Sequence, residues 1–331
     1  MDSVVPTAWV RGNAGQSRTK SVLKPEAVRP QPVVLCQPAL RAERVKVRGS
    51  PPPKGKGFVR CRVRDDRLWA NGGGDWFLHD TMAASSPSFT VFIDFDGTLV
   101  EPNVAIIVVE RFAKDGPRLA REVDRRLKAE ELTLREAWEE EAAALPANRL
   151  DEMVEFVREN APLRSGAREF LDLLRQHHVP TTILSGGLDS FIRPVLEREG
   201  LDLPVLSEEA NQGPGGNLRV VHPHGHPTCR LCGICKAAAV TKVDGSRGVF
   251  IGDGSTDRYG AEVADIVFAR HRLLEYCRKT DIPCFPFEDF GPVTARMSAW
   301  LEGREPVPPP RATGREASRC PISQELARSR K

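Results

Sequence analysis

The sequence contains no apolar run close to the ~20 residues that a membrane-spanning helix requires, so we expect no membrane contact. Aromatic residues are also few, at 6% of the 331 residues. The basic N-terminal segment lacks the interleaved aromatic residues and the modules typical of nucleic-acid binding, so we expect no nucleic-acid partner. The hydrophobic content of 40% is ordinary for a globular protein. Nothing in the composition predicts the oligomeric state.

Acidic residues are scarce near the N-terminus: residues 1–60 hold twelve Lys or Arg and three Asp or Glu, a net charge of +9 in a chain whose total is +3. This segment also lacks the apolar core of a secretory signal. Residues 1–85 are therefore predicted to be a disordered basic leader, a transit peptide followed by a linker. A plastid is favoured, with a mitochondrion or the cytosol as alternatives. The Pro-rich residues 303–331 are predicted to be a disordered tail.

The eight cysteines are not spaced like a disulfide framework, which favours a reducing compartment. Some of them, including Cys320, fall in segments predicted to be disordered. Three others, Cys229, Cys232 and Cys235, cluster in the segment HPHGHPTCRLCGIC. We consider three roles for this cluster. A structural loop is favoured, and a Zn²⁺ site or a set of redox-sensitive thiols are the alternatives.

Short β-rich apolar runs alternate with helical patterns from residue 89 onward. FTVFIDF, VPTTILSGG and GVFIGDG have the composition of buried parallel strands, and DIVFAR and IPCFPF indicate two shorter ones. Between the first two runs, residues 104–160 have helical patterns in which Leu119, Val123 and Leu127 recur on one face. That stripe is expected to be the core of a helical bundle. The alternation predicts an α/β fold with a doubly wound parallel sheet.

Polar motifs follow three of the predicted strands. Asp94 and Asp96 follow the first, Ser185 the second, and Asp253 the third. Doubly wound sheets bind ligands at the carboxyl ends of their strands, so these side chains are expected to share one site. Carboxylates at the end of a buried strand are costly to desolvate unless a cation or a proton-transfer task stabilises them. A solvated turn is the alternative for each motif taken alone.

Hydrolysis of a phosphate ester requires side chains of these types. Asp94 is the expected nucleophile, forming an aspartyl-phosphate, and Asp96 is the expected proton donor to the leaving oxygen. Asp253 and Asp94 are suited to Mg²⁺, which prefers oxygen ligands. Ser185 and Lys236, which begins a helical segment, are expected to bind phosphate oxygens.

The motifs DFDGT, SGG, Lys236 and GDGSTD, in this order and spacing, resemble those of the haloacid dehalogenase superfamily of phosphohydrolases. The resemblance implies a Rossmann-like core, residues 89–103 and 161–300, with a small helical cap at 104–160, and it implies a Mg²⁺ cofactor. The residue roles that it implies are nucleophile and metal ligand for Asp94, acid/base and metal ligand for Asp96, metal ligand for Asp253, phosphate binding for Ser185, Gly186 and Lys236, and support from Thr98, Gly254 and Asp257.

Longer segments, among them ILSGGLDSFI and CGICKAAAV, resemble the branch of this family that holds methionine-salvage phosphatase and, more distantly, phosphoserine phosphatase. This resemblance implies a phosphoric monoester hydrolase whose partner is a small phosphorylated metabolite. The methionine-salvage enol-phosphate is one expected substrate. Thiamine monophosphate, phosphoserine and phosphocholine are alternatives, as is a non-catalytic binding or assembly protein. Glu101, Asn103 and Arg164 are candidate substrate contacts on the cap side, although each is more often a surface or hinge residue.

Overall fold

The computed structural model describes residues 88–243 and 245–329. The leader predicted at residues 1–85 lies outside these ranges, so its targeting role stays a prediction. Within the described ranges, no helix combines the length and the apolar character needed to cross a bilayer.

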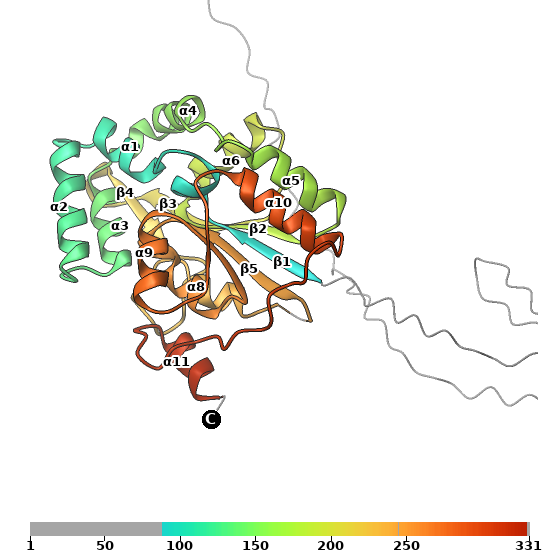
Figure 1. The fold of residues 1–331 in the computed structure, drawn as a ribbon. Helices are drawn as coiled ribbons and strands as arrows, with labels where there is room; N and C mark the ends of the chain where they lie inside the picture. The colour runs from blue at the N-terminus through green and yellow to red at the C-terminus, as the bar shows by residue number, and fades with distance from the viewer. Residues whose placement is uncertain (1–87, 244, 330–331) are drawn as a thin grey trace, which may run out of the picture. The chain divides into compact units, whose positions relative to one another are not determined.

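The described residues form a seven-stranded sheet in the order β4-β3-β2-β1-β5-β6-β7 (Figure 1). Neighbouring strands from β3 to β7 are parallel, and β4 pairs antiparallel with β3 at one edge. The three strands predicted to carry polar motifs are adjacent, with β1 between β2 and β5, and the predicted α/β fold is confirmed. The strands are β1 (Phe89–Ile93), β2 (Thr181–Leu188), β3 (Val205–Gln212), β4 (Leu218–Val221), β5 (Arg247–Gly252), β6 (Ile266–Ala269) and β7 (Phe285–Pro286).

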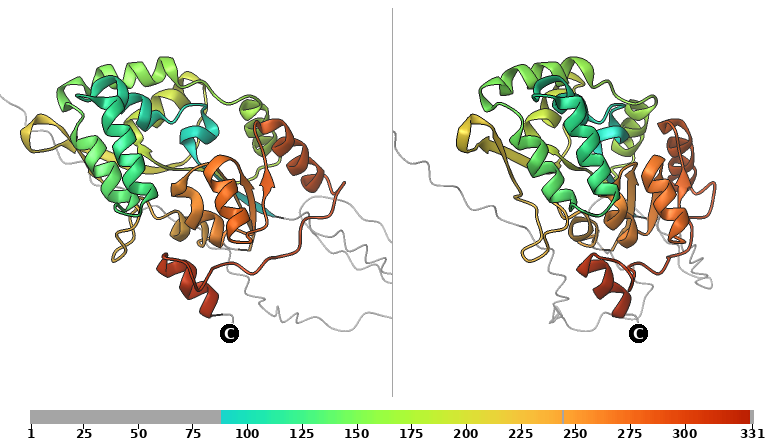
Figure 2. Two further views of the ribbon diagram at one scale, coloured as in Figure 1. Left: turned by 60° about the vertical axis from the view of Figure 1, so that its left-hand side comes forward. Right: turned by 90° about the vertical axis from the view of Figure 1, so that its left-hand side faces the viewer.

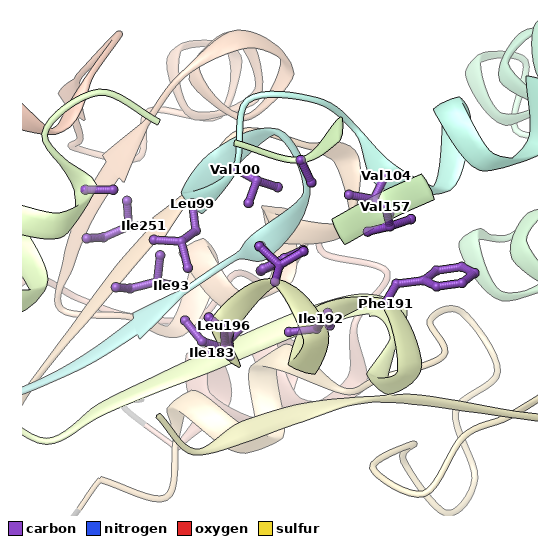
Figure 3. Packing of buried hydrophobic residues seen from close by; sticks show 14 of the residues in the cluster. Ile93, Leu99, Val100, Val104, Val157, Ile183, Phe191, Ile192, Leu196 and Ile251 are labelled. Atoms are coloured by element: carbon purple, nitrogen blue, oxygen red, sulfur yellow. The ribbon is translucent and has the colours of Figure 1, made fainter. Parts of the chain in front are cut away.

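Helices cover both faces of the sheet because apolar side chains of the central strands point alternately to each face. In β1, Val91 and Ile93 join one buried cluster, whereas Phe92 joins the other. Figure 3 shows part of the first cluster, where Ile93 and Ile183 lie near helix α6. Among the helices that contribute to the first cluster are α5 (Ala167–Gln176), α6 (Asp189–Arg198) and α10 (Phe290–Leu301), and α7 (Lys236–Val240), α8 (Arg258–Val263) and α9 (His271–Lys279) contribute to the second.

Four α-helices and a short 3-10 helix (Ala147–Arg149) occupy the range predicted to form a cap, and the α-helices lie beyond the carboxyl ends of the strands (Figure 1). Local signals define two of their starts: Asn103 caps the first helix, and Thr133 forms a capping box with Glu136 at the third. An ion pair of 2.7 Å between Asp124 and Arg272 joins the cap to α9 of the core. The cap helices are α1 (Val104–Phe112), α2 (Gly116–Lys128), α3 (Leu134–Ala143) and α4 (Leu150–Asn160).

The C-terminal segment corrects the prediction of a disordered tail at residues 303–331. Its described part, up to residue 329, runs along the outside of the core domain and ends in α11 (Pro321–Arg328) (Figure 2). Helix α11 contacts α8. Ser318 donates a hydrogen bond of 2.6 Å to Glu262, a fully buried carboxylate of α8, and Cys320 is buried in the second cluster. The composition is polar and Pro-rich on average, but a few well-spaced small and apolar side chains suffice to bury this segment.

Candidate active site

The carboxyl ends of β1, β2 and β5 bring the three polar motifs together. Asp94 follows β1, and its backbone N–H donates to the carbonyl of Ile251 in β5. Asp253 directly follows β5, and Ser185 lies in β2 beside β1. Because these strands are parallel neighbours, motifs that are far apart in the sequence form one site.

Lys236, the first residue of α7, lies between two carboxylates. Its Nζ donates to Oδ1 of Asp94 and to Oδ1 of Asp257, each at 2.6 Å, and all three side chains are buried. The second oxygen of Asp257 accepts from the backbone N–H groups of Asp253 and Gly254. Burial alone would lower the pKa of Lys236, but the charges of the two carboxylates raise it, so the ammonium stays charged. Asp257 therefore orients Lys236 and the turn after β5.

Three carboxylates form the one group of described His, Cys, Asp and Glu side chains that is compact enough to hold a metal ion. Asp94, Asp253 and Asp257 each place an oxygen within 4.8 Å of the others. Burial and the neighbouring charge of Asp257 raise the pKa of Asp94 well above its usual value, and they raise that of Asp253 to about 7. A divalent cation would relieve this repulsion, and Mg²⁺ prefers such oxygen ligands. The residues present therefore fit the predicted cofactor.

The carboxylate of Asp96 lies outside that group, so its predicted role as a metal ligand stays a prediction. Its Oδ1 accepts a hydrogen bond of 2.9 Å from the backbone N–H of Val104, the first residue of the cap, and its Oδ2 accepts one of 3.5 Å from Ser185. The free N–H groups at the start of α1 attract the carboxylate toward the cap. Burial raises the pKa of Asp96 to about 6, which favours a role in proton transfer.

Two buried arginines hold the loop after Asp96 through its backbone. The carbonyl of Gly97 accepts from Arg164 at 2.8 Å and from Arg270 at 3.0 Å. Gly97 has a φ of +74°, and a Cβ there would lie 2.6 Å from Oδ2 of Asp253, so this position requires glycine. Arg164 therefore positions the loop, rather than meeting a substrate as the sequence allowed.

The other two cap-side candidates occupy different positions. Asn103 accepts a hydrogen bond from the backbone N–H of Ile106 and also lines the cavity described below. The side chain of Glu101 is exposed, and its backbone carbonyl accepts from Arg164. Of the three candidates, only Asn103 is placed to meet a ligand.

A cavity of about 590 Å³ lies between the strand ends and the cap. Asp94, Asp96, Asp253 and Gly186 line its core side. Two residues of the stripe that was predicted to be bundle core, Val123 and Leu127, instead line the opposite wall, whereas Leu119 packs against the first buried cluster. Apolar side chains on the cap wall include Ile106, Ala120, Val123, Leu127, Leu134 and Trp138.

Acidic residues that the sequence did not single out also line this cavity. They are Glu208 in β3, Glu141 in α3, Glu275 in α9, and Asp124, which is paired with Arg272. Their local sequences, such as SEEA and EEEA, look the same as those of solvated acids on any surface. One signal in the sequence could have identified Glu141. It lies three residues after Trp138 in a predicted helix, and residues three apart are neighbours on one face of a helix.

The cysteine cluster forms a loop that leads into α7. Cys229, Cys232 and Cys235 line a narrow pocket together with Cys320 from the C-terminal segment. The described cysteines are free thiols, and within the described ranges they do not converge as a set of metal ligands. The favoured prediction of a structural loop fits this geometry, and the zinc and redox alternatives stay predictions.

The fold and the site together define a hydrolase of phosphoric monoesters. Residues 91–262 match the family model described as haloacid dehalogenase-like hydrolase, and this range spans all the polar motifs. The chain belongs to this family and is a phosphoric monoester hydrolase.

The chain is similar to phosphatases among curated proteins and among solved structures. The chain is 33% identical over 221 residues to the 2-hydroxy-3-keto-5-methylthiopentenyl-1-phosphate phosphatases of Bacillus thuringiensis (strain Al Hakam) and Bacillus cereus (strain AH820), which covers 65% of this chain and 98% of each relative. A phospho-aspartyl intermediate analogue of phosphoserine phosphatase is 19% identical with a TM-score of 0.50, covering 64% of this chain and 99% of that one. A phosphoserine phosphohydrolase-like protein from Francisella tularensis subsp. tularensis SCHU S4 is 18% identical, with the same TM-score and coverage. These two structures show the fold alone.

Proposed function

We propose that this protein hydrolyses a small phosphorylated metabolite in a Mg²⁺-dependent reaction that passes through an aspartyl-phosphate on Asp94. The observation that carries this proposal is the buried Lys236, which donates to Asp94 and Asp257 at 2.6 Å each beside a cavity of about 590 Å³. A lysine in this position stabilises the ionised carboxylate and orients it, as a nucleophile requires.

In the first step, a carboxylate oxygen of Asp94 attacks phosphorus opposite the ester oxygen. The new oxygen–phosphorus bond forms as the bond to the leaving group breaks, and Asp96 gives its proton to the leaving oxygen. Ser185, the backbone N–H of Gly186 and Lys236 bind the remaining phosphoryl oxygens, whose charge they balance.

In the second step, water attacks the phosphorus of the aspartyl-phosphate. Asp96, now ionised, takes a proton from that water, and inorganic phosphate leaves as the carboxylate of Asp94 is restored. The hydrogen bond from Val104 holds Asp96 on the cap side of the phosphoryl group, where the leaving group and then the water must lie.

Asp94 and Asp253 are the residues that would hold Mg²⁺, which when bound supplies positive charge that stabilises the transferring phosphoryl group. Thr98 orients Asp253 by donating a hydrogen bond of 3.1 Å to its Oδ1. Asp257 acts indirectly, because its oxygens are already engaged by Lys236 and by two backbone N–H groups.

For the substrate, we propose 2-hydroxy-3-keto-5-methylthiopentenyl-1-phosphate, which appears in the name of the curated relatives. The apolar cap wall around Leu127 and Trp138 supports this proposal, since it matches an apolar methylthio tail. Phosphoserine fits less well, because its leaving group carries a carboxylate beside its ammonium, and Glu141 and Glu208 on the cavity wall disfavour that carboxylate.

A leaving group that carries positive charge is the second candidate, and the acidic wall favours it. Glu141, Glu208 and the aromatic ring of Trp138 line the same cavity, and both carboxylates and aromatic faces attract cations. Thiamine monophosphate and phosphocholine are the alternatives of this kind.

The test is phosphate release by the purified protein with Mg²⁺, across these esters and phosphoserine, beside the variant Asp94→Asn. The variant keeps the size of the side chain but removes the nucleophile, so turnover should fall by several orders of magnitude while thermal unfolding shows an intact fold. A chelator should abolish turnover of the unmodified protein, and added Mg²⁺ should restore it. Turnover retained by the Asn variant would refute the mechanism. No release from any ester by a folded protein would favour a binding or assembly role.

A further inference from the structure

Glu208 is a buried carboxylate on the cavity wall that the two phosphoryl-transfer steps do not use. It lies in β3 opposite Leu188 of β2, next to the stretch of β2 that contains Ser185 and in which the register of the strand pair shifts. Its side chain is 1% exposed, and it lines the same cavity as Asp94 and Asp96. A carboxylate buried to this extent is costly to the fold unless hydrogen bonds satisfy its oxygens.

One oxygen of Glu208 is paired and the other is not. Oε2 lies 2.8 Å from Nδ1 of His222, whose other ring nitrogen, Nε2, lies 2.9 Å from Oε1 of Glu139 on the cap. Oε1 of Glu208 is buried and, among the described residues, makes no hydrogen bond of normal geometry, although the backbone N–H of Ile234 acts on the carboxylate from the loop. A buried acceptor without a partner has given up the hydrogen bond that water would provide, so a donor on a bound ligand would satisfy it.

The loop before Lys236 holds Glu208 in this arrangement. A Cβ on Gly233 would clash with Oε1 of Glu208 and would lie 2.7 Å from Nδ1 of His222, so the loop backbone passes close to both side chains. Only glycine permits that approach. His222 begins the segment HPHGHPTCRLCGIC and Gly233 lies near its end, so this segment fixes Glu208 as well as leading into α7.

The groups that face Glu208 determine where its proton lies. Each ring nitrogen of His222 lies against a carboxylate, and each of these two contacts needs a proton to be a hydrogen bond. A neutral imidazole has a single N–H. The second proton therefore lies either on the imidazole or on one of the two carboxyl groups. Arg135 donates to Glu139 at 2.8 Å and thereby stabilises its ionised form. Burial raises the pKa of Glu208 to about 7, against the opposing effects of His222 and of the backbone N–H of Ile234. When the proton lies on His222, Glu208 is ionised and Oε1 is an acceptor.

We propose that Glu208 determines substrate specificity by accepting, through Oε1, a hydrogen bond from a hydroxyl or ammonium group on the leaving group of the substrate. This inference rests on the proposed phosphohydrolase function and adds the class of leaving group that the site selects. Glu208 lies one strand outward from the phosphate-binding Ser185. Part of the leaving group must extend beyond the phosphoryl group into the cavity that Glu208 lines.

The test compares alkyl phosphates, in several matched chain lengths, that end in a methyl, hydroxyl, ammonium or ketone group. With the full-length protein and Mg²⁺, kcat/KM should be about tenfold or more higher for the hydroxyl or ammonium ester than for the methyl ester, as expected for one hydrogen bond to a charged acceptor. Glu208→Gln, which keeps the size of the side chain, should remove most of this preference. Glu209→Gln, its exposed neighbour in β3, is the matched control and should retain the preference.

The outcomes separate this inference from the proposed function. A preference for the ammonium or for the hydroxyl ester supports the proposal and tells which donor the site selects. A preference for the ketone ester would overturn it, because Glu208 would then be a donor. Equal kcat/KM for every ester in the unmodified protein would also overturn it, whether or not Glu208→Gln folds. No phosphate release from any ester would refute the proposed function and this inference with it.

Discussion

Glu141, on the cap wall of the cavity, should make the stability of the protein depend on pH. Burial, followed by the charges of Glu140 and Asp124, raises the pKa of Glu141 from 4.5 to about 7. A carboxyl whose pKa is raised in the folded state is harder to ionise there than in the unfolded chain. Its unfavourable contribution is therefore absent below about pH 4.5, grows as the pH rises, and is fully present above about pH 7.

The size of this effect follows from the interval between the two pKa values. Each pH unit corresponds to about 1.4 kcal/mol, which sets a ceiling of about 3 kcal/mol. The side chain is partly exposed, so we discount the ceiling to about 1–2 kcal/mol. Glu141→Gln, which carries no charge, should therefore raise the free energy of unfolding by about 1–2 kcal/mol at pH 8 and change it little at pH 4.5.

Urea unfolding of both proteins at the two pH values measures this difference. Glu110→Gln, at an exposed position of α1, is the matched control and should show a small change that is the same at both values. An equal gain for Glu141→Gln at pH 8 and pH 4.5 would mean that the gain comes from packing rather than from charge. No gain at pH 8 would refute the argument that the folded cap disfavours the ionised carboxyl.

Two further substitutions test the site. Lys236→Met should lower the free energy of unfolding by about 3–5 kcal/mol in urea without Mg²⁺, because two buried carboxylates lose their counter-charge; a loss below ~1 kcal/mol would contradict that account. Gly97→Ala should reduce kcat more than about a hundredfold, since the added Cβ would displace Asp253. Gly200→Ala is the control, because Gly200 also has a positive φ but open space where a Cβ would lie, so this variant should keep kcat. An equal loss of kcat in both variants would show that backbone strain, rather than the contact with Asp253, is the cause.

Features of the fold and site that depend on a short stretch of chain could be predicted from the sequence. An apolar β-rich run that ends in a carboxylate identifies both a buried strand and its carboxyl end, which located Asp94 and Asp253. The order of such runs indicates parallel neighbours, and parallel neighbours place their ends on one edge of the sheet. Capping residues such as Asn103 act within one helical turn, so they too are visible in the sequence.

Only the tertiary structure decided what each side chain faces. Periodicity shows that Val123 lies on an apolar face of its helix, but whether that face meets another helix or a cavity depends on the surrounding layers. The same holds for Glu208, whose unpaired oxygen results from a strand, the cap and a loop that are distant in the sequence. For the C-terminal segment, average composition predicted disorder, whereas individual contacts such as Ser318 with Glu262 determine its place. The sequence by itself thus determined the reacting groups, because their chemistry and strand-end positions are local. The walls that surround the substrate depend on contacts between distant segments, which no local pattern records.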